Sequence, residues 1–192
     1  MIVIVKYNAG NIRSVKNSLD RIGVESVITD DPETLMSAEK VIFPGVGEAG
    51  TAMSYLKERE LDQVIISLKQ PFLGICLGMQ LMCLHSEEKD TECLGIFKEK
   101  VKKFPPKGII PHMGWNDFIQ VKGPLFEGIE KTDNMYFVHS YYVELGEDTV
   151  GETDYLVSFT SALQKDNFYG VQFHPEKSAD VGRKLIENFL AL

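Results

Sequence analysis

The sequence predicts an α/β fold in which a mixed, centrally parallel sheet lies between helices as a three-layer sandwich. Three observations predict it: short apolar runs alternate with helix-periodic segments in the first half, strand-like segments follow one another in the second half, and 44% of the 192 residues are hydrophobic. Alternating strands and helices are typical of parallel sheets covered on both faces. A chain of this length can bury one ordinary core, so we expect a single domain over residues 1–192.

The first half supplies the parallel strands and the helices between them. Apolar residues recur at helical spacing from Ile12 to Ile22, and residues 48–69 have a helical pattern with a break near Glu60. Short apolar runs predict strands at residues 2–5, 26–29, 41–45 and 71–75. Ligands of such sheets collect at the carboxyl ends of the strands, so the turns after these runs are the places to look for a site.

The second half has strand-like segments joined by short turns, which indicates antiparallel additions to the sheet. These segments are "NDFIQV", "NMYFVHSYYVEL", "YLVSFTSALQK" and "FYGVQFHPE". A final helix is expected from about Ser178, a plausible N-cap, with Val181, Leu185 and Phe189 on one face.

Composition excludes several classes of protein. A net charge of -8 repels nucleic acid and anionic membranes. The longest apolar run, residues 72–84, is too short to span a bilayer, and the N-terminus reads as a buried strand and not as a signal peptide, so we expect a cytoplasmic protein. Three cysteines without a CxxC pair and four scattered histidines predict neither disulfides nor a metal site, and no cofactor is expected.

Cys76 is the first candidate for chemistry. In "GICLGMQ" it falls directly after a predicted strand and directly before a predicted helix, with glycines at 74 and 78 to relieve crowding. This is the pattern of a nucleophile elbow with sulfur in place of oxygen, at a helix N-terminus that favours the thiolate. The alternative is a small buried hydrophobic residue in a tight turn. Cys83 and Cys93 have no such setting and are expected in the core or at the surface.

The segment "QFHPEKS" offers a base and an orienting group for a thiolate. In an extended segment His174 and Glu176 point to the same side, and Pro175 stiffens the link. The carboxylate can then accept from one imidazole nitrogen while the other faces the sulfur. Among the other histidines, we expect structural or surface positions for His112 and His85, whereas His139 can line the pocket.

The turn "PGVGEAG" follows another parallel strand. Gly45, Gly47 and Gly50 match GxGxxG, the pattern of a dinucleotide site, but the next strand ends at a cysteine and not at the acidic residue that would hold a ribose. A glycine turn beside the elbow can instead direct backbone N–H groups of residues 45–47, including Val46, at a developing oxyanion together with the N–H of Leu77.

Taken together, "PGVG", "GICLGMQL" and "FHPE" resemble class I glutamine amidotransferases in order and approximate separation. The resemblance covers essentially the whole chain and implies a flavodoxin-like sandwich. "YNAGNIRSV", "PHMGWN", "YFVHSYY" and "FHPEKS" are similar to one branch, whose members feed ammonia to a histidine-pathway cyclase that makes imidazole glycerol phosphate and an aminoimidazole carboxamide ribotide.

The resemblance implies a role for each matching residue. Cys76 would attack the side-chain amide of glutamine and form a thioester, His174 would protonate the departing ammonia and later activate water, and Glu176 would orient the imidazole. By the same resemblance, the glutamine pocket contains Gln80, Glu88 near the α-amino group, and the main chain of His139, Ser140 and Tyr141 near the α-carboxylate.

The resemblance also implies a heterodimer with a (β/α)8-barrel cyclase subunit, which 192 residues of this pattern could not themselves supply. Residues that match positions at or near the docking face are Asn11, Trp115, Tyr136 and Lys177. The glutaminase of this branch is nearly idle until the cyclase binds its own substrate. We hypothesise that the peptide at Gly45–Val46 rests with its N–H turned away from the oxyanion position and rotates on docking.

Two departures from the family pattern are the residues Lys6 and Asn8, where aspartate and glycine are usual, and Ala49-Gly50, where an aromatic residue is common. The first could change the docking face and the second could loosen the oxyanion turn. Two alternatives stay open: a paralogue that feeds another synthase, in surface-sugar or pyridoxal phosphate synthesis, and a non-catalytic nucleotide-binding module in which Cys76 is merely packed.

Overall fold

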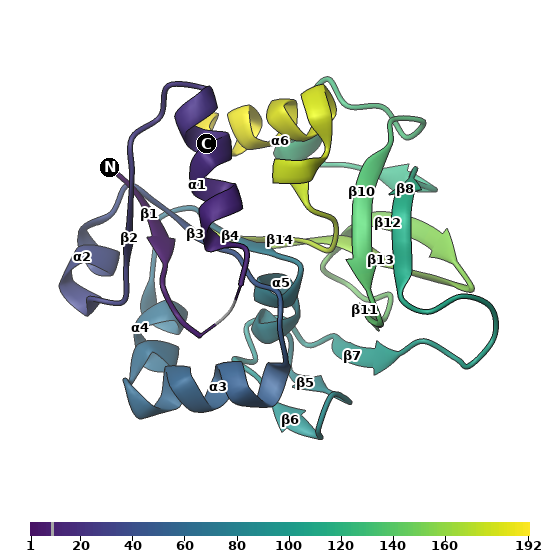
Figure 1. Cartoon of the computed structure of the whole chain (residues 1–192), viewed down its shortest axis with the longest axis horizontal. Helices are drawn as coiled ribbons and strands as arrows, with labels where there is room; N and C mark the ends of the chain where they lie inside the picture. Colours follow the sequence, from purple (N-terminus) through teal and green to yellow (C-terminus); the bar gives the residue numbers. More distant parts are fainter. Residues whose placement is uncertain (9) are drawn as a thin grey trace.

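The structure is a computed structural model that describes residues 1–8 and 10–192. Its central feature is a twelve-stranded mixed sheet whose first five strands in spatial order run parallel (Figure 1). These are β2 (Ser26–Thr29), β1 (Ile2–Val5), β3 (Lys40–Phe43), β4 (Phe72–Ile75) and β14 (Phe168–Val171). The predicted α/β class with a centrally parallel sheet is confirmed.

Helices cover both faces of the parallel strands, as the two hydrophobic clusters show. Ile2 and Ile4 of β1 pack into one cluster with α1 (Ile12–Arg21) and α6 (Ala179–Ala191). Val3 and Val5 point to the other face. That face is covered by α2 (Pro32–Ser37), α3 (Ala49–Glu58), α4 (Leu61–Ser67) and α5 (Leu77–Met82). Alternate residues of one strand therefore fill two cores, which explains the unbroken apolar run.

The remaining strands extend the sheet beyond β14. The strand order continues through β13 (Val157–Lys165), β11 (Tyr141–Val143), β7 (Lys100–Lys103), β5 (His85–Ser86) and β6 (Thr91–Glu92). Off this path, β12 (Thr149–Tyr155) pairs with β13 and with β9 (Gln120–Val121). A separate two-stranded sheet joins β8 (His112–Asn116) to β10 (Met135–His139). Two 3₁₀ turns, η1 (Pro124–Phe126) and η2 (Pro175–Lys177), complete the elements.

Several details differ from the sequence-based expectation. The segment around "MYFVHSYYV" breaks at Ser140, so β10 and β11 belong to different sheets. The strand β14 is antiparallel to β13 but parallel to β4, because β13 and β14 form a hairpin at the edge of the parallel half. Residues 117–119 are not part of a strand. Ser178 precedes α6 as expected, but its hydroxyl donates to the carbonyl of His174 and makes no cap bond to the helix.

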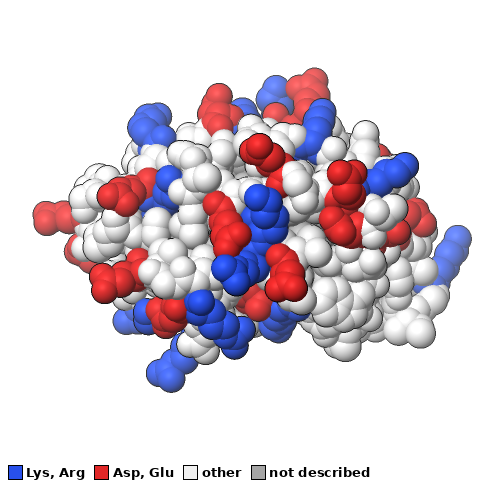
Figure 2. All heavy atoms as spheres, turned by 90° about the horizontal axis from the view of Figure 1, so that it is seen from above, with Lys and Arg blue, Asp and Glu red and all other residues white. Residues whose placement is uncertain are grey.

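Acidic and basic side chains are interspersed on the molecular face seen from above α1 and α6 (Figure 2). Among the residues that the structure describes, no helix is long and apolar enough to cross a membrane.

Candidate active site

Cys76 lies in a sharp turn between β4 and α5. Its backbone has φ 53° and ψ -109°, a conformation that residues other than glycine rarely adopt, and its N–H donates to the carbonyl of Val171 at 2.8 Å. A Cβ atom at Gly78 would collide with the carbonyl oxygen of Phe43, and one at Gly74 would collide with the side chain of Met82. Glycine at both positions is what lets the strand turn into the helix within one residue.

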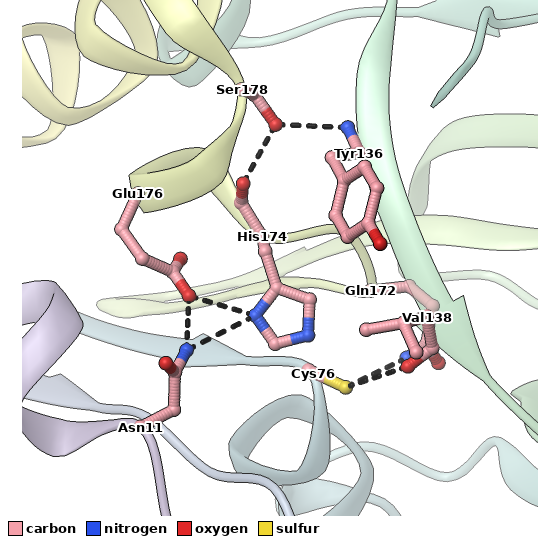
Figure 3. A network of polar contacts seen from close by, with 8 residues as sticks. All are labelled: Asn11, Cys76, Tyr136, Val138, Gln172, His174, Glu176 and Ser178. Carbon is pink, nitrogen blue, oxygen red and sulfur yellow. Dashed lines mark hydrogen bonds and ion pairs between the residues drawn. The ribbon is translucent and has the colours of Figure 1, made fainter. Parts of the chain in front are cut away.

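His174 lies three residues after the end of β14, and Glu176 lies in the 3₁₀ turn η2. The His174 Nδ1 atom is 2.8 Å from Oε1 of Glu176, and both side chains are fully buried (Figure 3). Asn11 directs its side-chain amide to the same carboxylate oxygen. The segment is not extended as expected, because Pro175 begins the 3₁₀ turn; that turn brings the carboxylate back to the imidazole.

The second ring nitrogen of His174, Nε2, points toward the sulfur of Cys76 and has no hydrogen-bond partner among the described residues (Figure 3). Burial lowers the pKa of His174, but the negative charge on Cys76 and the hydrogen-bonded carboxylate of Glu176 more than offset it and raise the pKa to about 10. The arrangement therefore favours a protonated imidazole beside the sulfur at neutral pH.

A cavity of about 290 Å³ opens over the sulfur. It brings together most of the residues that the sequence singled out, along with Pro111 and Val138. Its lining consists of Val46, Gly47, Cys76, Leu77, Gln80, Glu88, Pro111, Val138, His139, Ser140 and Tyr141. Gly45, His174 and Glu176 do not line it. The imidazole thus lies beside the sulfur, outside the cavity lining.

Glu88 is the carboxylate at the wall of this cavity. Its Oε2 accepts a hydrogen bond from the N–H of Ala49 at 2.8 Å, and burial raises its pKa despite that bond. Ala49, one of the departures from the family pattern, is thus the residue whose backbone N–H binds this carboxylate. The other departures are at the surface: Asn8 donates to the carbonyl of Thr51 at 3.2 Å, and Lys6 is an exposed side chain.

One expected oxyanion donor, the N–H of Leu77, is engaged within the protein. The N–H of Leu77 donates to the carbonyl of Gly45 at 3.2 Å, so the position that an oxyanion would occupy faces a carbonyl oxygen instead. The turn is held from the segment after β1: the Tyr7 hydroxyl donates to the carbonyl of Pro44 at 2.6 Å, and the Gly10 N–H donates to that of Val46 at 3.0 Å. The expected role of the Leu77 N–H as an oxyanion donor therefore stays a prediction that requires a change in this turn.

His139 and His112 form a second buried group beside the cavity. His139 Nδ1 lies 2.7 Å from the carbonyl oxygen of Tyr141, and its Nε2 lies 3.0 Å from Nδ1 of His112. Burial lowers the pKa of His139 to about 3 and that of His112 to about 4. Both rings are therefore neutral, and His112 is a core residue.

Gln172 is the residue that sequence reasoning missed. Its side chain is completely buried, and its Nε2 lies 3.6 Å from the sulfur of Cys76 (Figure 3). Its Oε1 accepts from Nε2 of Gln80 at 2.9 Å. The sequence does carry a signal for it: a glutamine between Val171 and Phe173, both fully buried, is a polar residue in a core segment and needs hydrogen-bond partners.

Of the four residues matched to a docking face, only some lie together at the surface. Trp115 is 55% exposed, and its ring meets that of Tyr136 edge-on across β8 and β10, with ring centroids 5.9 Å apart. Trp115 and the exposed Lys177 line a common surface hollow that reaches Glu176. Asn11 instead points at the buried carboxylate. Among the described residues, no group of three or more His, Cys, Asp or Glu side chains is placed to hold a metal ion.

Comparison with known proteins gives a consistent picture. Residues 3–192 match the family model described as glutamine amidotransferase class-I. The chain is 57% identical over 194 residues to a Bacteroides fragilis protein named imidazole glycerol phosphate synthase subunit HisH, with 100% of this chain and 99% of the relative covered. A Methanococcus maripaludis protein named subunit HisH 1 of that synthase is 48% identical, with all of both chains covered.

Solved structures share the fold at much lower identity. A crystal structure of a glutamine amidotransferase has a TM-score of 0.76 at 19% identity, covering 100% of this chain and 98% of the other. The structure of PurLQS from Thermotoga maritima contains a chain with a TM-score of 0.70 at 17% identity, covering 99% of this chain and 97% of that chain. At these identities the likeness concerns the fold alone.

Proposed function

Because the chain belongs to the class I glutamine amidotransferases, we propose that it is the glutaminase subunit of an imidazole glycerol phosphate synthase. One observation carries the proposal: 57% identity to a subunit of that name extends over the full length of both chains. The reaction is hydrolysis of glutamine to glutamate and ammonia, and the ammonia is then used by a cyclase subunit.

Cys76 is the proposed nucleophile. Its thiolate forms a bond to the amide carbon of glutamine while the carbonyl electron pair moves to oxygen. When the carbonyl re-forms, the C–N bond breaks, the proton on His174 Nε2 goes to the leaving nitrogen, and ammonia departs from a thioester. The neutral imidazole then takes a proton from water, whose oxygen attacks the thioester carbon. The C–S bond breaks, glutamate is released, and the thiolate is restored beside the imidazolium. Glu176 accepts from Nδ1 throughout, which keeps Nε2 directed at the reacting atoms.

The cavity over Cys76 is the proposed glutamine site. Glu88 supplies a carboxylate at its wall, which suits the substrate's α-ammonium group. The main chain of Ser140 and the residues on either side of it is the proposed contact for the α-carboxylate. Gln80 completes the wall, but its amide donates to the carbonyl of Tyr141 at 2.9 Å, so its proposed role is to hold that segment in place.

The Gly45 peptide is the proposed gate. Its carbonyl now accepts from Leu77, and rotation of the peptide between Gly45 and Val46 would free the Leu77 N–H and replace a repelling oxygen with donors. A Cβ atom at Gly45 would collide with the Tyr7 hydroxyl, so glycine at this position also lets the turn pack closely. Loss of one oxyanion donor typically costs about 100- to 1,000-fold in rate, which is enough to keep the resting subunit nearly idle.

The proposed partner is a (β/α)8-barrel cyclase that docks on the side of Trp115 and Lys177. An exposed tryptophan is a frequent anchor of protein interfaces, and here it lies beside the hollow that reaches Glu176. A partner seated there would contact the turn that holds the carboxylate and could bias the resting conformation.

The test is to measure glutamine hydrolysis by the purified chain alone, with the cyclase, and with the cyclase and its nucleotide substrate. We expect glutamine hydrolysis to be activated only when the cyclase and its nucleotide are both present. If the chain alone already hydrolysed glutamine as fast as the complex, the proposed gate would be contradicted. Activation by a different synthase would indicate a paralogue of the surface-sugar or pyridoxal phosphate pathway. If a glutamine-like electrophile added no mass to Cys76, the protein would instead be a non-catalytic module.

A further inference from the structure

A continuous row of polar side chains runs from the buried histidine pair to the sulfur of Cys76. From its outer end, the row passes through Asn116, His112, His139, the carbonyl of Tyr141, Gln80 and Gln172 to the sulfur. The residues whose side chains link Asn116 to Cys76 are at most 6% exposed, so their hydrogen bonds are set by one another and not by water.

The direction of the row follows from its fixed members. The Tyr141 carbonyl can only accept, so His139 carries its proton on Nδ1 and, being neutral, accepts at Nε2. His112 must then donate from Nδ1 at 3.0 Å and accept at Nε2, where the side-chain amide of Asn116 donates at 3.3 Å.

The same carbonyl fixes the other half of the row. Gln80 must present its NH₂ group to Tyr141 at 2.9 Å, and the same nitrogen reaches Oε1 of Gln172 at 2.9 Å. Gln172 consequently turns its own NH₂ group toward the sulfur, 3.6 Å away. The opposite orientation of Gln172 would place two NH₂ groups against each other in a buried site.

From this geometry we propose that Gln172 is a positioning residue that donates a hydrogen bond to the Cys76 thiolate, and that Gln80 sets its orientation. The inference rests on the proposed role of Cys76 as nucleophile. As a thiol, the sulfur can donate to the carbonyl of Val138 at 3.9 Å; as a thiolate it can only accept, and Gln172 meets it on the side away from the imidazole of His174 (Figure 3). Gln172 therefore favours the charged form and fixes the direction of its lone pairs.

Two variants separate this role from packing. Gln172→Met keeps the approximate length and removes the donor, and Gln172→Glu keeps the shape but offers an oxygen to the sulfur. The measured quantity is the rate at which iodoacetamide alkylates Cys76 between pH 5 and 10, located by peptide mass spectrometry. We expect the midpoint to move up by about one pH unit in Gln172→Met, which is about a tenfold slower reaction below the midpoint, and further in Gln172→Glu.

The other titratable groups that face the sulfur are unchanged in these variants. They are His174 with Glu176, which follow β14, and Tyr7 after β1. The Tyr7 hydroxyl donates to the carbonyl of Pro44, and burial raises its pKa well above its usual value. A matched control is Asn188→Asp, which also puts a carboxylate in place of a buried amide, but on α6, where the side chain donates to the carbonyls of Leu125 and Glu127. It should leave the midpoint where it is in the native chain.

Turnover in the complex with cyclase and nucleotide gives a second readout. Gln172 does not line the cavity, so we expect kcat to fall about tenfold in Gln172→Met while KM changes less than about twofold. In the native chain, the side-chain amide protons of Gln172 should shift in NMR spectra with the titration of Cys76, a measurement that requires no variant to fold.

The outcomes distinguish two failures. If native Cys76 reacts no faster than the half-buried Cys93, the nucleophile itself is wrong. If native Cys76 is reactive but neither variant moves the midpoint, or the Gln172 amide protons ignore the titration, the positioning role of Gln172 is overturned while the proposed function stands.

Discussion

Two groups of buried histidines lie near the same cavity and have opposite charge states. His174 is 0% exposed, His112 3% and His139 6%, so burial does not distinguish them. Yet the pKa of His174 is raised to about 10, while those of His112 and His139 are lowered to about 4 and about 3. The difference in pKa comes from the residues that surround each imidazole.

His174 has a sulfur and a carboxylate as neighbours, both of which can carry negative charge. His112 stacks on the ring of Tyr155 with centroids 3.9 Å apart, and His139 packs against Phe104 and Phe159. Aromatic rings and a carbonyl leave desolvation unopposed, and the imidazole stays neutral. A buried histidine is thus available for proton transfer only where a counter-charge accompanies it, and otherwise it serves as a directional hydrogen-bonding spacer.

The largest effect is expected from Cys76→Ser, which removes the charge that sets His174 apart. Glutamine turnover by the complex should fall by about 10⁴-fold or more, because a serine hydroxyl does not ionise beside the imidazole, while synthesis from added ammonia is spared. The pKa of His174, followed by NMR, should fall at the same time. Cys93→Ser is the control, since that half-buried thiol has no imidazole partner; retained turnover in Cys76→Ser would contradict the assignment.

Glu176→Gln removes the second counter-charge and is expected to have the next largest effect. The amide cannot hold an imidazolium as a carboxylate does, so the pKa of His174 should fall and glutamine turnover should drop by about 100-fold. The comparison is made with Glu187→Gln on α6, where the exposed carboxylate pairs with Arg183 at 2.8 Å and turnover should be unchanged. Equal effects of the two changes would mean that Glu176 acts only through net charge.

The lowered pKa values of His112 and His139 should affect the free energy of unfolding and not the rate of glutamine hydrolysis. An unfolded histidine binds a proton near pH 6.5, but His112 in the folded chain does so only near pH 4, so the unfolded state binds more protons between these values. The free energy of unfolding must therefore fall as pH falls through this window, by roughly 3 kcal/mol from His112. In urea titrations at pH 7, 5 and 4, His112→Gln should lose less stability than the native chain; identical losses would refute the lowered pKa.

For His174 the linkage has the opposite sign. Its folded pKa of about 10 lies above the unfolded value, so its contribution to stability is fully present below about pH 6.5 and is lost as pH rises toward 10. His112 therefore lowers the free energy of unfolding as pH falls, whereas His174 lowers it as pH rises.

The sequence predicted the parts of this site that depend on local geometry. The glycines at 74 and 78 around Cys76 indicated a strand that turns at once into a helix. They are needed because Gly78 closely approaches Phe43 and Gly74 closely approaches Met82. The spacing of His174 and Glu176 predicted their contact, although the 3₁₀ turn and not an extended chain produces it. The unbroken apolar run at residues 2–5 predicted a strand of a sheet covered on both faces, as β1 is.

What the sequence could not predict depends on partners far apart in the chain. Gln172 and Gln80 are 92 residues apart, and nothing near either predicts that one orients the other. The engaged state of Leu77 depends on which way the Gly45 peptide faces, which a glycine leaves free. β12 was missed because its exposed and half-buried positions carry polar residues such as Asp154, so it lacks the apolar run that marks a central strand.

The smallest effect is expected from Asn116→Asp, which gives His112 a negatively charged neighbour like those of His174. The side-chain amide of Asn116 now donates to His112 Nε2 at 3.3 Å, and Asn116→Asp would replace this donor with a carboxylate that accepts. His112 would then gain the kind of counter-charge that His174 already has, and its pKa, followed by NMR titration, should rise by about one unit. The rise is limited because Asn116 is only partly buried, and the aromatic neighbours of His112 still oppose its charge. Asp117→Asn, next to it at the exposed surface, is the control. If the pKa of His112 did not move, the aromatic surroundings alone would set its charge, and the contrast with His174 would no longer be a matter of counter-charge.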